Sequence, residues 1–120
     1  MRTGAAEKGK RGEELALDYL TGKGYQLKER RYRAPGGEID FIVEMGDLLV
    51  FVEVKYRPRG QAGSGMEAVN QKKQKRILKA AGEYLRYEDR FARPLRFDVV
   101  EITSQGILHV ENAFMGEWTP

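Results

Sequence analysis

Two short groups of charged residues stand inside otherwise apolar stretches of this chain. The first is Glu38-Ile39-Asp40, and the second is Glu53-Val54-Lys55. Strands made mostly of valine, isoleucine and phenylalanine seldom carry three carboxylates and a lysine on one face for packing, because such charges repel one another and are costly to desolvate. A bound divalent cation would relieve the repulsion and would explain the lysine. The pattern therefore indicates a metal-dependent hydrolytic site.

Strand periodicity predicts how these acids lie relative to one another. We expect a hairpin whose turn is centred on Met45-Gly46. This turn places Asp40 opposite Phe51, and it places Glu38 opposite Glu53. Because side chains alternate along a strand, all the acids should point to one side of the hairpin. The residues expected on that side are Glu38, Asp40, Phe51, Glu53 and Lys55, and those expected on the opposite, core side are Val50, Val52, Val54 and Tyr56.

The repulsion between the acids indicates whether the acidic face needs a bound counter-charge. Two carboxylates about 5 Å apart repel by roughly 3 kcal/mol at an effective dielectric constant near 20. A small domain is stable by only about 5–15 kcal/mol, so it would not normally keep that repulsion uncompensated. The alternative is that Lys55 simply forms a cross-strand ion pair with Glu38 or Glu53. That pairing leaves at least two acids without a counter-charge.

The elements that must position these residues follow from periodicity and from turn residues. Alternating helices and strands predict an α/β fold, an α+β sandwich around a short mixed sheet with flanking helices. Ser64-Gly65-Met66-Glu67 fits a capping box for the second helix, whose buried face should include Val69, Ile77, Ala81, Tyr84 and Leu85. The expected elements are a helix over 9–23, an edge strand over 25–32, strands over 38–44 and 48–57, a helix to about 87, and strands over 95–102 and 107–111.

Length and composition limit the class of protein. A chain of 120 residues suits a single domain. We expect a flexible basic tail over 1–8 and one domain over 9–120. No apolar run reaches the roughly 18 residues that span a bilayer, so no membrane association is expected. The chain has no cysteine, which excludes a thiolate metal site and is compatible with the cytoplasm, where we expect the protein.

Basic residues cluster on either side of the acidic groups. The net charge of +3 is small by itself, but clusters at 28–33, 55–59 and 72–79 flank a carboxylate site, as a polyanionic substrate would require. Each cluster could equally be a solvated face. The glycine-rich segment 60–65 lacks the lysine and hydroxyl residue of a phosphate loop, although it could close on a substrate. His109 has no histidine partner, so a structural role is favoured for it.

The acids and their flanking residues together form an extended pattern. It comprises Gly12-Glu13, Gly36-Gly37-Glu38-Ile39-Asp40, Val50-Phe51-Val52-Glu53-Val54-Lys55-Tyr56-Arg57, Ala68-Val69, Lys73-Gln74 and Arg96-Phe97-Asp98-Val99-Val100. Over about residues 9–115 the chain resembles the YraN-like family of small bacterial proteins. An acid followed by a (D/E)-x-K strand also resembles the PD-(D/E)xK superfamily, which includes restriction endonucleases and Holliday-junction resolvases. In this chain Ile39-Asp40 replaces the proline-aspartate pair of that name, at a position that commonly varies.

The resemblance implies a restriction endonuclease-like core and two further site residues. Resolvases of this fold carry a glutamate on the first helix that completes the metal site, and Glu13 occupies the matching position, with Glu14 as the alternative. Related nucleases present a glutamine from the helix after the hairpin, which here is Gln74. Either residue could instead be an ordinary polar residue of a helix surface.

Together these observations predict a Mg²⁺- or Mn²⁺-dependent endonuclease. Glu13, Asp40 and Glu53 would hold the metal, Lys55 would assist the attacking water, and Glu38 and Gln74 would support them. DNA is favoured over RNA, and branched or single-stranded DNA over a specific sequence, with a homodimer suiting a junction-cutting role. The alternative is a nucleic-acid-binding or protein-adaptor module that kept the fold without turnover. The residues expected to contact the nucleic-acid backbone are Arg57, Arg59, Lys72, Lys73, Lys75 and Arg76.

Overall fold

The computed structural model describes residues 5–59, 70–88 and 93–114, with side chains from residue 11 onward. Each predicted helix and strand is present, and the strand bounds lie close to those expected. The first helix begins at Ala5 rather than at Gly9. The elements are α1 (Ala5–Gly22), β1 (Gln26–Ala34), β2 (Gly37–Met45), β3 (Leu48–Arg57), α2 (Gln71–Glu88), β4 (Leu95–Thr103) and β5 (Gly106–Val110).

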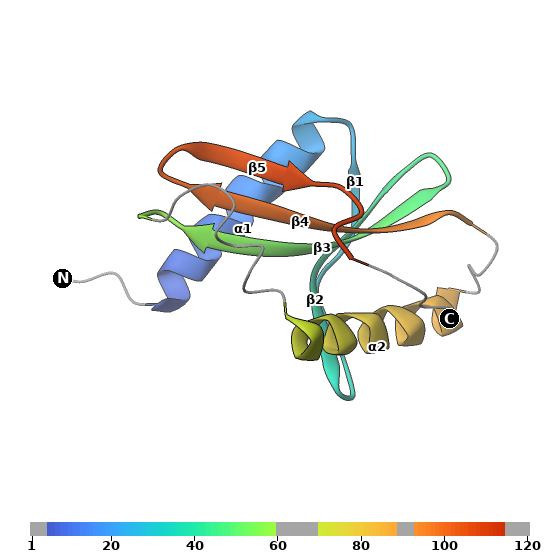
Figure 1. Cartoon of the computed structure of the whole chain (residues 1–120). Helices are drawn as coiled ribbons and strands as arrows, with labels where there is room; N and C mark the ends of the chain where they lie inside the picture. The colour runs from blue at the N-terminus through green and yellow to red at the C-terminus, as the bar shows by residue number, and fades with distance from the viewer. Residues whose placement is uncertain (1–4, 60–69, 89–92, 115–120) are drawn as a thin grey trace.

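The five strands form one mixed sheet in the order β1-β2-β3-β4-β5. Strands β3 and β4 are parallel, and the other neighbours are antiparallel. A parallel pair needs a long crossover connection, and α2 lies in the connection between β3 and β4. Figure 1 shows α1 and α2 on opposite faces of the sheet. The predicted α+β fold is confirmed, and it is consistent with a restriction endonuclease-like core.

The core has two parts, one under each helix. Val50 and Val52 pack with α1, as predicted for the core side of β3. The expectation that only this side forms the core is wrong. Leu49 and Phe51, on the side of the acids, are also fully buried, because α2 packs over them. Both faces of β3 are therefore covered, and the acids lie at the edge of the α2-side core.

The described part of α2 begins at Gln71. Its first turn is capped by Asn70, whose Oδ1 accepts a hydrogen bond from the Lys73 N–H at 3.0 Å. A helix running without interruption from about Met66 is therefore wrong, because Asn70 is not helical. The expected capping box, Val69 and the glycine-rich segment 60–65 lie outside the described residues. The predicted buried face is confirmed for the other four residues, which are Ile77, Ala81, Tyr84 and Leu85.

The register of the β2–β3 hairpin differs from the prediction by two residues. Met45 pairs with Leu48, so Gly46 and Asp47 form the turn. Gly46 adopts a φ of 60°, which favours glycine at this turn position. Phe51 faces Ile42 rather than Asp40. A shift of two residues keeps every side chain on the same face, so the acids still lie on the predicted face.

Two glycines permit close packing of the helices on the two faces of the sheet. A Cβ at Gly37 would overlap the backbone oxygen of Arg76, so glycine at this position lets the start of β2 lie directly against α2. A Cβ at Gly12 would lie 2.6 Å from the Cβ of Tyr56, so α1 approaches β3 equally closely. Substitution of either glycine would push a helix away from the sheet.

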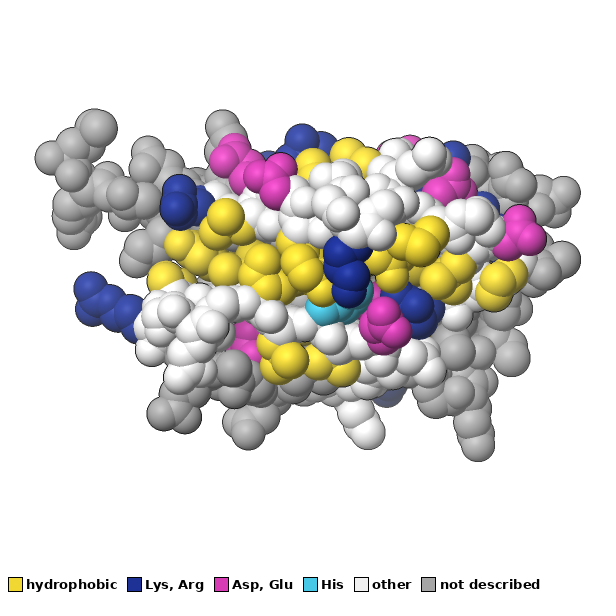
Figure 2. All heavy atoms as spheres, turned by 90° about the horizontal axis from the view of Figure 1, so that it is seen from above, with side chains coloured by type: hydrophobic (Ala, Val, Ile, Leu, Met, Phe, Trp, Pro, Cys, Tyr) yellow, Lys and Arg dark blue, Asp and Glu magenta, His cyan; other side chains and the backbone are white. Residues whose placement is uncertain are grey.

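The surface around α1 and β5 is partly apolar. Figure 2 shows a band of hydrophobic side chains on this side, interrupted by a group of basic, acidic and histidine side chains. The large hydrophobic residues that are most exposed among the described residues are Leu27, Met45, Ile107 and Leu108. No helix in the described ranges is long and apolar enough to cross a membrane.

Candidate functional site

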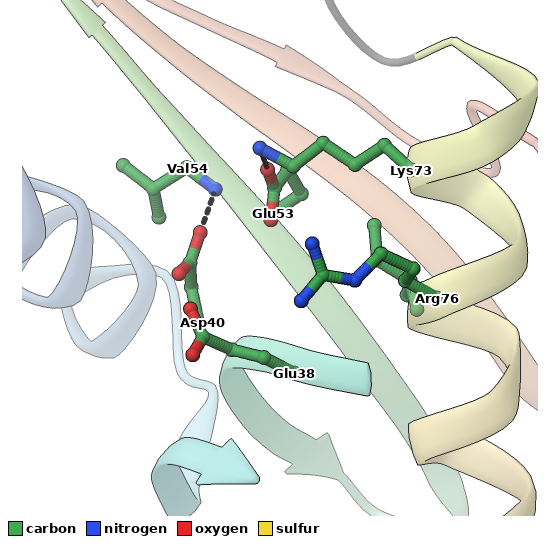
Figure 3. Close-up of a pocket in the computed structure, with 7 residues that line it drawn as sticks. Glu38, Asp40, Glu53, Val54, Lys73 and Arg76 are labelled. Atoms are coloured by element: carbon green, nitrogen blue, oxygen red, sulfur yellow. Dashed lines mark hydrogen bonds and ion pairs between the residues drawn. The ribbon is translucent and has the colours of Figure 1, made fainter. Parts of the chain in front are cut away.

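The predicted acids line a cavity of about 230 Å³ between the hairpin and α2. Asp40 extends from β2 and Glu53 from β3, while Lys73 and Arg76 reach in from α2 (Figure 3). The structure therefore brings together acids that are distant in sequence, as strand periodicity predicted. The residues lining the cavity are Glu38, Asp40, Glu53, Val54, Lys73, Arg76 and Ile77.

Asp40 is held where regular pairing between β2 and β3 ends. The last pair of the ladder on this side is Phe41 with Val52. Just beyond it, Val54 N–H donates a hydrogen bond to Asp40 Oδ2 at 2.8 Å. Burial and the neighbouring Glu53 carboxylate raise the pKa of Asp40 to about 8, although the bond from Val54 opposes this shift. Hydrogen bonding with Glu53 adds to the rise in the pKa of Asp40.

Glu53 is buried and receives two lysines at a single oxygen. Its side chain is 5% exposed, and Lys55 Nζ lies 3.2 Å from Oε2. Lys73 Nζ contacts the same oxygen from α2. Burial, together with the neighbouring Lys73, lowers the pKa of Lys55. Burial is the largest single influence on Lys73 and disfavours its charged form, but the hydrogen bonds to Glu53 and Lys55 and the attraction to Glu53 and Asp40 together raise the pKa of Lys73.

The other predicted support residue, Glu38, lies at the margin of the cavity. Its carboxylate accepts a hydrogen bond from Arg33 Nε at 3.1 Å, and both side chains are well exposed. The Arg76 guanidinium points into the space between Glu38 and Glu53 in Figure 3. The open side of the cavity is thus bordered by both signs of charge.

Glu13 does not line the cavity. Both of its carboxylate oxygens accept hydrogen bonds from Arg31 Nε, at 2.9 and 3.1 Å. It belongs to a neighbouring depression formed by α1 and β1, together with Glu14 and Asp18. Arg31 reaches Glu13 from a part of β1 with irregular geometry, since its φ is 51° and the β1–β2 register shifts between Leu27 and Glu29. In this arrangement Arg31 is the partner of Glu13.

The remaining predicted residues lie on the surrounding surface. Gln74 is half-buried on α2 and is not among the residues lining the cavity. Among the residues predicted to contact the nucleic-acid backbone, only Lys73 and Arg76 line the cavity. Lys73 differs from the others because its charge is already paired with Glu53. The exposed cations of this group are Arg57, Arg59, Lys72, Lys75 and Arg76.

The donor set at the cavity fits a magnesium-type ion held by two carboxylates. Such ions take hard oxygen ligands, usually one or two carboxylates plus waters and substrate phosphate oxygens. Asp40 and Glu53 supply two adjacent carboxyl groups, and a divalent cation would take the place of the proton that the raised pKa of Asp40 favours. Within the described ranges, no group of three acidic, histidine or cysteine side chains lies close enough to hold an ion. The fit is therefore to a two-carboxylate site.

Comparison with known proteins places the chain in a family. The model of the family described as "Uncharacterised protein family UPF0102" matches residues 12–102. The chain belongs to this family. A UPF0102 protein of Thermodesulfovibrio yellowstonii is 44% identical over 108 residues, which are 90% of this chain and 96% of the relative. A UPF0102 protein of Persephonella marina is 41% identical over 109 residues, or 89% and 92% of the two chains. One from Clostridioides difficile is 42% identical over 110 residues, or 90% and 96%.

Membership of UPF0102 confirms the resemblance to the YraN-like family that the motif residues indicated. The matched range runs from the middle of α1 almost to the end of β4 and so contains every residue lining the cavity. The cavity therefore lies within the part of the chain by which UPF0102 is recognised.

Sequence reasoning missed two partners of the acids. Lys73 was expected to face nucleic acid, but it is bound to Glu53. Arg31 was not expected near Glu13 at all. The helical phase of α2 contained some information about Lys73, since it lies four residues before the buried Ile77 and so on the inward side. No feature of the sequence pointed to the contact of Arg31, because it depends on the irregular part of β1.

Proposed function

We propose that this protein hydrolyses DNA phosphodiester bonds with the help of Mg²⁺ or Mn²⁺. The observation that carries the proposal is the pair of adjacent carboxylates, Asp40 and Glu53, at a cavity with Lys55 beside them. Such a pair is electrostatically unfavourable unless a proton or a cation joins it. A group whose pKa is strongly perturbed in a cavity is a candidate for function.

The residues of the cavity would divide the work in the following way. A divalent ion, when bound, supplies a Lewis acid for the phosphoryl oxygens and lowers the pKa of a bound water. Asp40 and Glu53 would hold that ion. Lys55, whose pKa is lowered, would accept the proton of the attacking water or stabilise negative charge on the phosphoryl group. Glu38 and Gln74 would orient the other groups.

Glu13 enters the proposal as a further ligand that depends on a change of partner. The resemblance to resolvases assigns a first-helix glutamate to the metal site. In this structure Glu13 is paired with Arg31. The negative charges of Asp40 and Glu38 also contribute to the raised pKa of Arg31. A third carboxylate would reach the site only if Glu13 exchanged Arg31 for the cation.

A polyanionic partner is supported by the exposed cations near the cavity. Arg57 ends β3 and Arg59 lies two residues beyond it, and Lys72, Lys75 and Arg76 are exposed on α2. Contacts of this kind make affinity fall steeply with salt. They fix position without reading bases, so recognition of branched or single-stranded DNA is favoured over recognition of a sequence. A homodimer would suit the cutting of a branched substrate.

One observation favours a second candidate, a binding module without turnover. Glu53 already has two cationic partners, Lys55 and Lys73. An acid that is fully paired needs no metal for stability. In this alternative the protein binds nucleic acid or another protein through the same fold and leaves the phosphodiester bond intact.

Cleavage assays separate these candidates. The protein is incubated with branched, nicked, single-stranded and duplex DNA and with Mn²⁺, beside Lys55→Ala and the control Lys28→Ala. Lys28 is a β1 residue whose nearest acid is Glu44 at 3.8 Å, away from the cavity. Loss of a general base typically lowers the rate by about 10²–10⁴-fold, so Lys55→Ala should lose cleavage and Lys28→Ala should keep it.

Two results would refute the enzymatic role. Equal cleavage by wild type and Lys55→Ala would point to a contaminating nuclease. Absence of cleavage on every substrate, together with salt-dependent binding of the same DNA, would favour the module without turnover.

A further inference from the structure

Glu53 has an unusual set of partners for a metal ligand. Its carboxylate is 5% exposed, and a single oxygen, Oε2, receives both Lys55 and Lys73. Lys55 lies two residues further along the same strand, with a side chain 14% exposed. Lys73 comes from α2, across the cavity, and its side chain is 40% exposed. Of the two lysines, Lys73 is therefore the one with access to solvent.

The backbone of Lys73 is fixed while its amine is free to move. Its N–H is held by Asn70 Oδ1 at 3.0 Å in the first turn of α2. Its side chain is a flexible four-carbon stem that carries a compact charge, so the amine can leave Glu53 without any change in the helix. The same side chain lines the cavity together with Arg76. A displaced Lys73 would therefore remain beside the site.

We propose that Lys73 is the resident counter-ion of the metal site, which a divalent cation must displace from Glu53 Oε2. This inference rests on the proposed function. The ammonium group and the ion are both positive and compete for the same carboxylate oxygen. The displaced amine becomes available to a phosphate of the substrate at the cavity.

A thermodynamic consequence follows from this competition. Metal binding has to break the Lys73–Glu53 ion pair, so the ion alone binds weakly. A phosphate that takes up Lys73 removes this competition and strengthens metal binding, and by linkage the metal strengthens phosphate binding equally. The metal and the polyanion would then bind cooperatively, and the site would be complete only when both are present.

Calorimetric titration with Mn²⁺, without nucleic acid, tests the competition directly. Lys73→Met removes the charge and keeps most of the side-chain volume. Lys79→Met is the matched control, because Lys79 is exposed on the same helix and does not line the cavity. We expect Lys73→Met to bind Mn²⁺ at least about fivefold more tightly than wild type, within the usual range for coupled sites, and Lys79→Met to match wild type. Equal or weaker binding by Lys73→Met would overturn the proposal.

Amine labelling of the wild-type protein gives a second measurement that needs no variant. Reductive methylation followed by mass spectrometry reports the accessibility of each lysine. Mn²⁺ should increase the labelling of Lys73 and leave Lys79 unchanged. Unchanged labelling of Lys73 at saturating Mn²⁺ would contradict displacement even if Lys73→Met failed to fold.

The outcomes also separate this inference from the proposed function. If wild type binds Mn²⁺, Asp40→Asn loses that binding and Lys73→Met binds no more tightly, the counter-ion role fails and the metal site stands. If wild type fails to bind but Lys73→Met does, the counter-ion role is supported. If neither binds, both proposals fail.

Discussion

Two buried aspartates of this sheet have opposite surroundings. Asp98 on β4 is fully buried, and four hydrogen bonds satisfy it. Two come from Arg96 at 2.8 Å each, one from His109 Nε2 at 2.7 Å and one from the Asn112 N–H at 3.0 Å. Burial would raise the pKa of Asp98, but the bonds from His109 and Arg96 outweigh it and lower the pKa. Asp40 has Val54 N–H and a second carboxylate as neighbours, and its pKa is raised to about 8.

The difference separates a structural aspartate from a candidate ligand. Asp98 ties β4 to β5 and to the segment that follows β5, with His109 in turn 3.1 Å from the Tyr19 hydroxyl on α1. Every oxygen of Asp98 is occupied by the protein itself, so it has no capacity for a ligand. Asp40 lies at a cavity beside Glu53, where a cation would lower the energy of the site. Burial of an acid therefore indicates function only where its counter-charge is incomplete.

The largest effect expected from this comparison is on stability. Asp98→Asn should lower the free energy of unfolding by about 3–5 kcal/mol, because it removes the buried carboxylate that pairs with both Arg96 and His109. Asp40→Asn should cost nothing, since asparagine keeps an acceptor for Val54 N–H and removes the repulsion with Glu53. Urea denaturation at pH 7 measures both values. A loss of similar size for the two variants would show that Asp40 is as well satisfied as Asp98.

The pH dependence of stability should separate the same two residues. The folded-state pKa of Asp40 is about 8 against an ordinary value of 3.8, so from about pH 4 to 8 the folded protein holds a proton that the unfolded chain has released. Stability contributed by this group therefore falls as pH rises through that window. Asp98 has a lowered pKa, so its contribution is present above its ordinary value and is lost as pH falls towards its folded-state pKa.

Urea denaturation of wild type and Asp40→Asn at pH 5 and pH 8 measures this effect. We expect the advantage of Asp40→Asn to grow with pH, by at most about 1.4 kcal/mol per pH unit for one proton. Parallel stability profiles for the two proteins would mean that Asp40 ionises normally in the folded state.

The sequence predicted the face of the acids better than it predicted their pairing. Alternation along β2 and β3 depends only on the parity of the residues, so Glu38, Asp40 and Glu53 were assigned to one side correctly. Register depends on which two residues make the turn, and Met45-Gly46 and Gly46-Asp47 fit the same apolar pattern. The structure chose the second pair, with Gly46 at a φ of 60°.

Contacts between distant elements were less predictable than faces. The partners of Asp98 come from its own strand, from β5 and from the residues after β5, and no short motif joins them. Lys73 stands among four basic residues within five positions, and only the start of α2 at Gln71 decides which of them faces Glu53. The acids could be identified from the sequence because charged residues inside a short apolar strand are unfavourable and stand out from their neighbours. Their ion-pair partners could not, because these partners come from other elements and depend on the whole fold.

The smallest expected effect concerns Glu13 and tests whether the site contains a third acid. Glu13→Gln should leave the free energy of unfolding almost unchanged, because its partner Arg31 is 53% exposed and solvent-exposed ion pairs contribute little. We also expect it to weaken Mn²⁺ binding less than Asp40→Asn does, because Glu13 lies outside the cavity in the metal-free arrangement. Calorimetry on both variants measures the difference. If Glu13→Gln lost as much Mn²⁺ affinity as Asp40→Asn, Glu13 would have to leave Arg31 and bind the ion. Arg31 would then be a counter-ion that the metal displaces from Glu13, as we propose for Lys73 at Glu53.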